Sequence, residues 1–400
     1  MSSPTPGTAG TDAGARHPAA LWFMATVFVT FLAASTAPTP LYELYRAEWK
    51  FSALTLTLIF STYAFALLAA LLVFGSLSDY RGRREILVVA LVLELAAMLV
   101  FRNAGSATWL FVARAVQGVA TGMATSTLSA GMVDVQPQRG AMLNSIAPLF
   151  GMGVGALGAG ALAQFVPAPT HDVFDVLLVV LALQAVAAFR LPETVSRRDG
   201  AIAAMRPRLA VPARAWPTLL QLLPVNTAVW ALVGFYSSLG PSLARIVAGA
   251  ASPFLGGAVL ASLVLGGAGA VLLTRTLPAR RVLAGATVTL MIGVCVTLAS
   301  VEWHSLVGFF AGSLVAGLGL GSGFNAAIRT LVPLAESKER AGLMSTYYVL
   351  SYLSFSLPSI GAGVLTGRDG LQPASLIYGL LLLILGGVAL AMMARRQEGA

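Results

Sequence analysis

Long apolar stretches separated by short polar segments fill most of the chain. Twelve of these stretches approach the length of about 20 residues that a helix needs to cross a lipid bilayer. They are residues 19–38, 53–75, 86–102, 108–132, 140–165, 173–190, 216–239, 253–274, 282–300, 305–331, 341–365 and 372–394. Stretches this long and apolar satisfy their backbone amides as helices rather than as barrel strands. The pattern predicts an all-α polytopic membrane protein with twelve transmembrane helices.

Polar segments divide these stretches into two sets of six. Residues 1–18 are rich in Pro, Gly, Ser and Thr and lack the basic start of a signal peptide, so we predict a disordered tail. The longest connection, residues 191–215, is arginine-rich and is predicted to link two six-helix bundles. These bundles would cover residues 19–190 and 216–394, and residues 395–400 would form a second tail.

Short sequence similarities between the two sets indicate a duplicated six-helix unit. Gly118 is matched by Gly317, 199 residues later, in similar glycine-rich stretches. The segment "QRGAMLNS" from Gln138 is similar to "ERAGLMST" from Glu339, at an offset of 201 residues. Parallel six-helix halves packed around a cavity at the middle of the membrane are an architecture of transporters.

Composition and charge agree with a protein in lipid. Hydrophobic residues make up 57% of the chain and charged residues 10%. The net charge of +9 does not indicate a nucleic-acid partner, because the basic residues lie between the apolar stretches rather than along one stripe. One set of connections carries 19 Lys and Arg residues and the other carries 5, so both termini are predicted to lie in the cytoplasm and the protein in the cytoplasmic (inner) membrane.

Few residues in the chain are suited to enzyme or metal chemistry. Cys295 is the single cysteine, and the three histidines have no spacing typical of metal ligands. We find no catalytic triad pattern and no phosphate-binding loop of the Walker type. We therefore expect neither an enzyme nor a bound metal or cofactor, and we do not expect transport driven by ATP.

The segment "GSLSDYRGRREIL" from Gly75 is an unusual polar turn between the second and third stretches. It resembles the signature loop of the major facilitator superfamily, usually written G-x-L-x-D-R-x-G-R-R. The matching residues are Gly75, Leu77, Asp79, Gly82, Arg83 and Arg84, while Tyr80 replaces a residue that is usually basic. "RAVQG" from Arg114 and "LPET" from Leu191 are similar to two further motifs of this family.

The resemblance implies a twelve-helix fold in two pseudo-symmetric bundles and a gating role for this loop. Gly75 would allow close packing on a neighbouring helix, and Gly82 would permit the tight turn. Asp79 would meet the start of the eleventh span, near Arg340, and Arg83 would pair with Asp134. These contacts would connect the two halves and hold the cytoplasmic gate shut while the cavity faces outward. Alternatively, the arginines of the loop, Arg84 among them, serve only to fix the topology.

Two charged residues are predicted to lie deep in the membrane. Glu94 in the third span and Arg114 in the fourth would lie ~12 Å and ~9 Å from the outer surface, so an ion pair between them is plausible. Glu94 could carry a coupling proton, or the two residues could be a purely structural pair. Arg114 also resembles a cavity arginine of the family. Glu43, near the outer mouth, is a further candidate for the proton.

Glycines and polar side chains provide weaker indications. Gly151, Gly155 and Gly160 resemble an antiporter motif of the family, with Ala156 in place of its proline, and are predicted to pack the fifth span against the eighth. The following residues are candidates for the wall of a substrate cavity: Thr36, Tyr63, Gln117, Asn144, Asn226, Trp230, Tyr236, Asn325, Tyr347 and Tyr348. Each could instead form a helix–helix hydrogen bond or an anchor at the membrane interface.

These features predict a monomeric secondary transporter, similar to bacterial drug:proton antiporters, that moves a small amphipathic organic molecule by alternating access. Proton-coupled export is the favoured mechanism, and import of a small metabolite with protons is the alternative. A receptor or scaffold that transports nothing is the alternative from another class. The expected partners are the substrate, protons and the lipid bilayer.

Overall fold

The computed structural model describes residues 11–207, 209–336 and 338–398. Within these residues the chain forms helices and turns, without a β-strand, and twelve of the helices have 20 or more residues. The long helices are α1 (Thr11–Thr36), α3 (Ala53–Phe74), α5 (Arg83–Arg102), α6 (Ala107–Val135), α7 (Pro137–Phe165), α8 (Pro169–Ala188), α10 (Trp216–Ser238), α12 (Pro253–Thr274), α13 (Ala279–Glu302), α14 (Leu306–Leu331), α15 (Arg340–Asp369) and α16 (Leu371–Glu398). This arrangement confirms the predicted all-α fold.

Short helices lie between the long ones. They are α2 (Tyr42–Trp49), α4 (Ser78–Arg81), α9 (Ala201–Ala204), α11 (Gly240–Ala248) and the 3₁₀ turns η1 (Ala213–Ala215) and η2 (Val332–Leu334). Both α2 and α11 fall in segments that the hydrophobic pattern left as loops. Each follows the first long helix of its half, α1 or α10.

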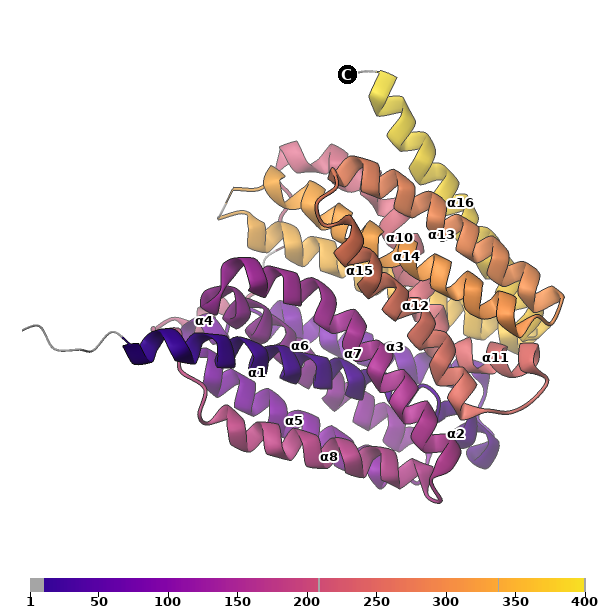
Figure 1. Cartoon of the computed structure of the whole chain (residues 1–400), viewed down its shortest axis with the longest axis horizontal. Helices are drawn as coiled ribbons and strands as arrows, with labels where there is room; N and C mark the ends of the chain where they lie inside the picture. The colour runs from indigo at the N-terminus through magenta and orange to yellow at the C-terminus, as the bar shows by residue number, and fades with distance from the viewer. Residues whose placement is uncertain (1–10, 208, 337, 399–400) are drawn as a thin grey trace, which may run out of the picture.

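The two halves repeat the same order of helices. The helix α3 has 22 residues, as has α12, which begins 200 residues later. Ser52 caps the start of α3 by accepting a hydrogen bond from Thr55, and Ser252 caps α12 in the same way with Leu255. Figure 1 shows α1 to α8 on one side of the molecule and α10 to α16 on the other. The duplicated unit predicted from the sequence is therefore visible in the fold.

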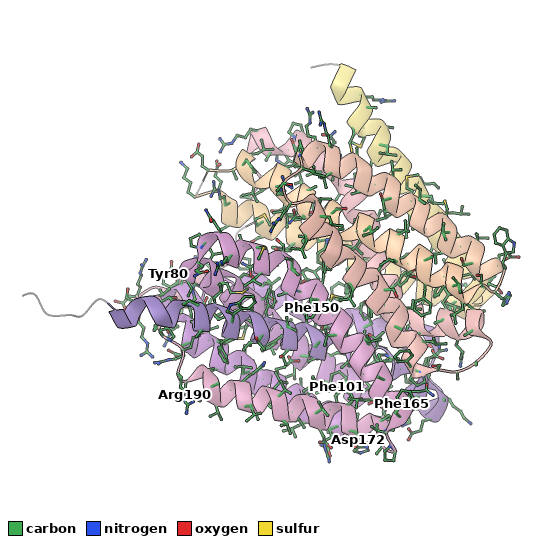
Figure 2. The ribbon with its side chains drawn as sticks, in the orientation of Figure 1. Tyr80, Phe101, Phe150, Phe165, Asp172 and Arg190 are labelled. Carbon is green, nitrogen blue, oxygen red and sulfur yellow. The ribbon has the colours of Figure 1, made fainter. Side chains whose placement is uncertain are left out.

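Within the described residues, ten helices are long and apolar enough to cross a membrane by length and composition. The two long helices outside this group are α5 and α6, which carry Glu94 and Arg114. Large apolar side chains are exposed on the bundle, among them Phe150 and Phe165, labelled in Figure 2, with exposed fractions of 47% and 79%. Such exposed apolar surface is typical of a lipid-facing exterior.

The ends of the chain differ from the prediction. The helix α1 begins at Thr11, so residues 11–18 are helical and not a disordered tail, while residues 1–10 lie outside the described residues. The helix α16 likewise continues to Glu398 through most of the predicted second tail, because "AMMARRQE" contains no helix-breaking residue.

The most extensive contacts between the halves are made by α7 with α12 and by α3 with α15. Between α7 and α12 a Cβ atom on Gly160 would lie 2.8 Å from the carbonyl oxygen of Pro253. Gly257 lies against the backbone of Ala156 in the same crossing, where a Cβ atom has no room. The close packing predicted for Gly160 is confirmed.

The prediction is wrong for the other two glycines of this motif. A Cβ atom on Gly151 would lie 2.5 Å from the carbonyl oxygen of Val29, and Gly155 lies against the backbone of Ala33. Both glycines therefore pack α7 against α1 within the same half. Residues 151, 155 and 160 are not all on one face of a helix with 3.6 residues per turn, so the motif serves two neighbours.

The connections lie on two opposite faces. We call the side with α4 and the connection 191–215 the linker face, and the side with α2 and α11 the far face. In Figure 1, α4 lies at the left, whereas α2 and α11 lie at the lower right.

Candidate functional site

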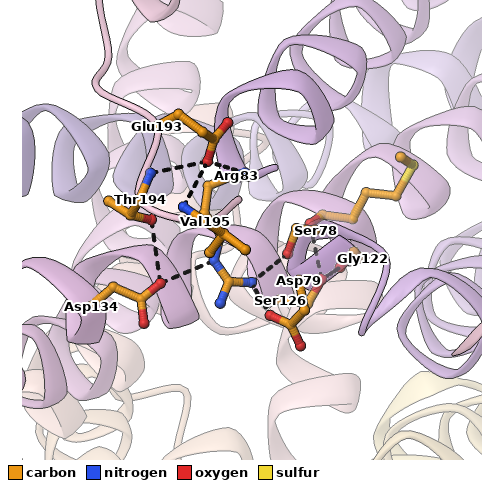
Figure 3. A network of polar contacts seen from close by, with 10 residues as sticks. Ser78, Asp79, Arg83, Gly122, Ser126, Asp134, Glu193, Thr194 and Val195 are labelled. Carbon is orange, nitrogen blue, oxygen red and sulfur yellow. Dashed lines mark hydrogen bonds and ion pairs between the residues drawn. The ribbon is translucent and has the colours of Figure 1, made fainter. Parts of the chain in front are cut away.

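Arg83 is the centre of a polar network on the linker face (Figure 3). Its Nε donates to Asp134 Oδ2 at 3.1 Å, and its Nη1 donates to Ser78 Oγ at 2.6 Å. The same Nη1 lies 2.5 Å from Asp79 Oδ1. Because Arg83 is only 7% exposed, its charge is held mainly by these two carboxylates. The predicted pair of Arg83 with Asp134 is confirmed.

In this structure the network lies within one half, and the bridge between the halves, which was predicted for the state whose cavity faces outward, is not formed. Asp134 lies near the end of α6 and Asp79 lies on α4, so both belong to the N-terminal half. Asp79 precedes Arg83 by four residues and pairs with it, and no hydrogen bond or ion pair joins Asp79 to α15 in the part of the chain that the structure describes. The start of α15 instead contacts the linker, where Gly342 O accepts a hydrogen bond from the backbone of Ala210.

Gly75 also differs from its predicted role. The three atoms nearest to a Cβ atom placed there all belong to the backbone of Leu71, one turn earlier, so the nearest packing is within its own helix. The side chain of Arg84 is exposed and makes no ion pair with any described residue. This exposure agrees with a role of Arg84 in topology alone.

Glu193, from the "LPET" segment, caps the start of α5. Its Oε1 accepts a hydrogen bond from the backbone N–H of Arg83 at 2.7 Å, and its Oε2 accepts one from that of Arg84 at 3.1 Å. Gly82 makes this approach possible, because its φ of 108° suits glycine and a Cβ atom would lie 2.5 Å from Glu193 Oε2. The sequence indicated the motif but not this contact.

We expect Glu193→Ala to lower the free energy of unfolding by about 1–2 kcal/mol, because two backbone N–H groups lose their acceptor and a helix N-terminus loses a favourable carboxylate. Thermal unfolding of the purified protein measures this change. Glu85→Ala is the matched control, since the one ion pair of Glu85 within the described residues is with Arg197 on the surface, at 2.8 Å. An equal loss in the two variants would show that the cap contributes no more than a surface ion pair.

Arg114 lies in the interior of the N-terminal half with no exposed surface. Its Nε donates to Tyr42 Oη, and its Nη1 donates to the carbonyl oxygen of Ser35 and to Gln117 Oε1, all at 2.7 Å. The guanidinium carbon also lies 5.5 Å, 5.4 Å and 5.6 Å from the ring centroids of Tyr42, Tyr63 and Phe101. Aromatic faces at this range stabilise a cation, so the charge is retained without direct contact to a carboxylate.

Glu94 is connected to Arg114 through Gln117 and not by an ion pair. Gln117 Nε2 donates to Glu94 Oε1 at 3.1 Å. Within the described residues, Arg114 and Glu94 form no ion pair, for which a nitrogen and an oxygen must lie within 4.0 Å. Gln117 follows Arg114 by three residues, which places its side chain on the same helix face. The direct ion pair considered for Glu94 and Arg114 is therefore not formed, and Gln117 connects the two residues by hydrogen bonds.

This chain ends in two unsatisfied atoms. Glu94 Oε2 and Arg114 Nη2 are buried without a hydrogen-bond partner in the described residues. A buried polar atom without a partner costs free energy, and such atoms are typical of sites that bind or release a proton, a water molecule or a ligand.

Glu43 joins the two halves on the far face. Its Oε2 lies 3.0 Å from Arg245 Nη1 on α11, and its Oε1 accepts a hydrogen bond from Ser242. Arg46 of its own helix completes the cluster at 3.3 Å. We call these four residues the far-face clasp. The sequence indicated Glu43 only as a charged residue near the outer mouth.

The clasp combines corresponding positions of the two repeats. Ser242 follows Glu43 by 199 residues, and Arg245 follows Arg46 by the same offset. The two short helices α2 and α11 are thus equivalent elements that meet across the boundary between the halves.

Three cavity candidates of the C-terminal half have unsatisfied polar atoms. Asn226 Oδ1 accepts a hydrogen bond from Ser351 Oγ at 3.2 Å, but Asn226 Nδ2 has no described partner. Trp230 Nε1 and Tyr347 Oη are likewise buried without one. Asn226 and Trp230 lie one turn apart on α10, and Tyr347 lies on the neighbouring α15.

Aromatic rings surround these groups and reach the other half. The Trp230 ring lies 5.5 Å from Phe324, 5.0 Å from Tyr352 and 5.9 Å from Phe355. Phe355 in turn lies 4.8 Å from Phe60 on α3. The cluster is therefore at the boundary between the halves and offers flat apolar surfaces beside hydrogen-bond donors.

Two other candidates form helix–helix hydrogen bonds, which was the alternative for each of them. Thr36 Oγ1 donates to the carbonyl oxygen of Met152 on α7 at 2.8 Å. Tyr236 Oη lies 2.9 Å from Ser313 Oγ and 3.3 Å from Thr297 Oγ1, inside the C-terminal half. In this structure both hydroxyl groups are hydrogen-bonded to neighbouring helices.

The remaining candidates lie toward the linker face. Asn144 Nδ2 donates to a carbonyl oxygen of α6 at 2.9 Å. Asn325 Nδ2 donates to Ser145 Oγ at 3.3 Å and so connects α14 to α7 across the halves. Tyr348 is partly buried, with its ring 6.3 Å from that of Tyr347.

Comparison with known proteins agrees with this architecture. Residues 23–277 match the sequence family described as the Major Facilitator Superfamily. The chain belongs to this superfamily and is a multi-pass membrane protein of the transporter class. A search of curated proteins gives no match.

Two solved structures have the same fold. One is a bacterial homologue of the human lysosomal transporter Spinster in an inward-facing and unoccupied conformation, with a TM-score of 0.76, 15% sequence identity, and coverage of 97% of this chain and 98% of that chain. The other is a mutant of the nucleoside transporter NupG, with a TM-score of 0.73, 11% identity, and coverage of 94% and 99%. Identities this low show similarity of fold alone.

Proposed function

We propose that this protein is a proton-coupled secondary transporter that exports a small amphipathic organic molecule by alternating access. The observation that carries the proposal is the buried chain of Glu94, Gln117 and Arg114. An ionisable residue within a membrane span is costly and is retained for function or for pairing. Here the carboxylate has no direct cationic partner, which favours a role in proton transfer.

The C-terminal half supports the proposed class of substrate. Trp230 Nε1 and Asn226 Nδ2 donate hydrogen bonds and cannot accept them. Tyr347 Oη can donate as well as accept. A ligand that fits these groups presents hydrogen-bond acceptors on a planar apolar body, which stacks on the rings around Trp230. A sugar phosphate would bring charge to a site built from neutral groups and is disfavoured.

Helix α2 connects the proton site to the far face. Tyr42 accepts the hydrogen bond from Arg114 Nε, and the next residue, Glu43, belongs to the far-face clasp. A change in the hydrogen bonds of Glu94 would shift the side chain of Gln117 and then that of Arg114. Because Arg114 is hydrogen-bonded to Tyr42, the position of α2 would change as well. We propose that protonation of Glu94 controls closure of the far face through this series of contacts.

The positive-inside distribution supports a cytoplasmic linker face, so the far face is the external one in this proposal. The clasp would then close the external side. The Arg83 network stiffens the cytoplasmic end of the N-terminal half and would form part of the inner gate.

Transport by the purified protein in liposomes tests the function. We would load vesicles with a panel of radiolabelled planar amphipathic compounds and impose a pH gradient of either sign, with a sugar phosphate as the negative comparison. Export predicts that a compound moves against its own gradient only when protons move the opposite way. Movement in the same direction as the protons would identify the importer, and no movement of any compound would favour a receptor or scaffold.

We expect Glu43→Gln to open the far face more often. The clasp is partly exposed, with 17% of the Glu43 side chain accessible, so loss of its charge is worth about 0.5–1 kcal/mol, or roughly a threefold change in equilibrium. The buried Thr39 reports on this opening because it donates a hydrogen bond to the carbonyl oxygen of Ser237 across the halves at 3.2 Å. The rate at which a membrane-impermeant maleimide labels Thr39→Cys, in a Cys295→Ser background, should rise accordingly.

Glu48→Gln is the matched control, since Glu48 is exposed on the same helix and has no described ion pair. Its labelling rate should stay at that of the parent protein. A Glu43→Gln rate equal to this control would show that the clasp does not hold the far face closed.

A further inference from the structure

A cavity on the linker face lies apart from the transport site and is rich in arginine. It has a volume of about 810 Å³ and lies between α4 and the connection 191–215. Its lining contains four arginines and a single acidic residue: Arg81, Arg197, Arg198, Arg206 and Asp199. Like charges gathered in one cavity repel one another unless an anion lies between them.

Most of this positive charge is not compensated by the protein. Arg197 pairs with Glu85 at 2.8 Å, whereas Arg81, Arg198 and Arg206 form no ion pair within the described residues. The guanidinium group presents several N–H donors in a fixed plane that matches the oxygens of a phosphate.

The cavity is held together by contacts between the linker and the signature loop. Arg198 N donates to the carbonyl oxygen of Tyr80 at 2.9 Å, and Ser76 Oγ donates to that of Ala204 at 2.8 Å. Gly200 turns the chain here with a φ of 97°. Figure 2 shows Tyr80 at the same end of the molecule as Arg190, where the linker begins. The signature loop thus holds an arginine-bearing segment of the linker through the backbone of Tyr80 and the side chain of Ser76.

An exposed apolar residue accompanies the arginines. Ile202 lines the cavity and is 82% exposed, which is unfavourable in water but suited to the boundary of a lipid layer. We propose that this cavity binds a phosphate group, and that the phosphate belongs to an anionic phospholipid of the surrounding leaflet. The arginines would hold the headgroup while Ile202 contacts its acyl region.

Binding can be measured on the full-length protein without any transport assay, so the outcome is independent of the proposed function. Thermal unfolding in a neutral detergent would be followed during titration with dihexanoyl phosphatidylglycerol, dihexanoyl phosphatidylcholine or glycerol 3-phosphate. We expect a saturable shift with phosphatidylglycerol. In Arg198→Gln/Arg206→Gln the half-saturating concentration should rise about tenfold or more, because two charge-assisted hydrogen bonds are lost.

Arg280→Gln/Arg281→Gln is the matched control, because it removes the same charge from exposed arginines at the start of α13, away from the cavity. Its half-saturating concentration should stay within about twofold of the parent value. An equal rise of the half-saturating concentration in the two double variants would contradict the proposed site. The absence of a saturable shift of the unfolding temperature with either anionic probe would contradict it as well.

Ile202→Ser separates the two sources of phosphate. If the ligand is a lipid, this variant should bind phosphatidylglycerol more weakly but glycerol 3-phosphate as before. If glycerol 3-phosphate saturates at the same concentration as the lipid and both are unaffected by Ile202→Ser, the phosphate site stands and its ligand is a soluble ester. A shift as large with phosphatidylcholine as with phosphatidylglycerol would contradict recognition of an anion.

Discussion

Replacing Arg114 by alanine is expected to reduce transport by about a hundredfold or more while leaving the protein in the membrane. Three hydrogen bonds at 2.7 Å are lost, to Tyr42, Ser35 and Gln117. Hydrogen bonds to a charged group contribute about 1.5–3 kcal/mol each, and about 2.8 kcal/mol on the rate-limiting step is a factor of a hundred. The loss would also separate Glu94 from α2, since Arg114 is the connection between them.

Lysine at this position should restore little activity. Arg114 Nε donates to Tyr42, and Nη1 donates to both Ser35 and Gln117. The N–H donors therefore belong to two nitrogen atoms of the planar guanidinium group. An ammonium group has its donors at a single nitrogen and cannot reproduce this spacing. The initial rate in liposomes, normalised to the amount of inserted protein, gives the comparison.

Arg102→Ala provides the control for removal of a positive charge from the same half. Arg102 lies 2.5 Å from Asp175, and both side chains are more than a third exposed, so this pair should contribute little. Activity of the lysine variant equal to that of arginine would mean that position 114 needs only a point charge. The role of Arg114 as a connector would then be wrong.

The sequence alone predicts the helices well because the membrane imposes a simple rule on them. Each span needs about 20 apolar residues, so the long helices follow directly from the hydrophobic pattern. Short helices at the surface obey no such rule. The helix α2 has eight residues with Glu43, Arg46 and Glu48 among them, and this mixture has the composition of a polar loop.

The sequence also predicts an ion pair between residues of family motifs in the same half. It does not predict whether the partner of a charged residue lies in the same half or in the other one. Arg83 and Asp134 form the expected contact, since each is positioned by an adjacent turn at the end of a helix. Asp79 was expected at α15 because its carboxylate would suit a helix N-terminus. The closer cation at Arg83 is a stronger partner and lies on the same turn of the chain.

Depth in the membrane, counted along a helix, is a useful but incomplete guide to contacts. Glu94 and Arg114 do lie near each other, as their depths predict. The count cannot show that Gln117 would lie between them, because that depends on how α5 and α6 are rotated about their axes. Rotation is determined by the packing of many side chains and not by residue spacing.

Glu94→Gln is expected to abolish uphill transport driven by a pH gradient and to preserve exchange of substrate between the two sides. Glutamine imitates the protonated acid and keeps an oxygen that can accept the hydrogen bond from Gln117, which is 3.1 Å long in the parent protein. Glutamine would fix the site in its protonated state, so no proton is carried, while binding of substrate can still drive the conformational change. Exchange needs only that change, whereas uphill movement needs the proton.

The stability of the same variant distinguishes proton transfer from a structural role. Arg114 retains its hydrogen bonds to Tyr42 and Ser35 when the carboxylate is removed, so we expect the free energy of unfolding to change by less than about 1 kcal/mol. Asp175→Asn, the same change of carboxylate to amide at an exposed site, is the control for both assays. If Glu94→Gln instead loses about 3 kcal/mol or more together with exchange, Glu94 is a structural partner that compensates the charge of Arg114. If it keeps both stability and uphill transport, the proton is carried elsewhere, and Glu43 in the far-face clasp is the next carboxylate to replace.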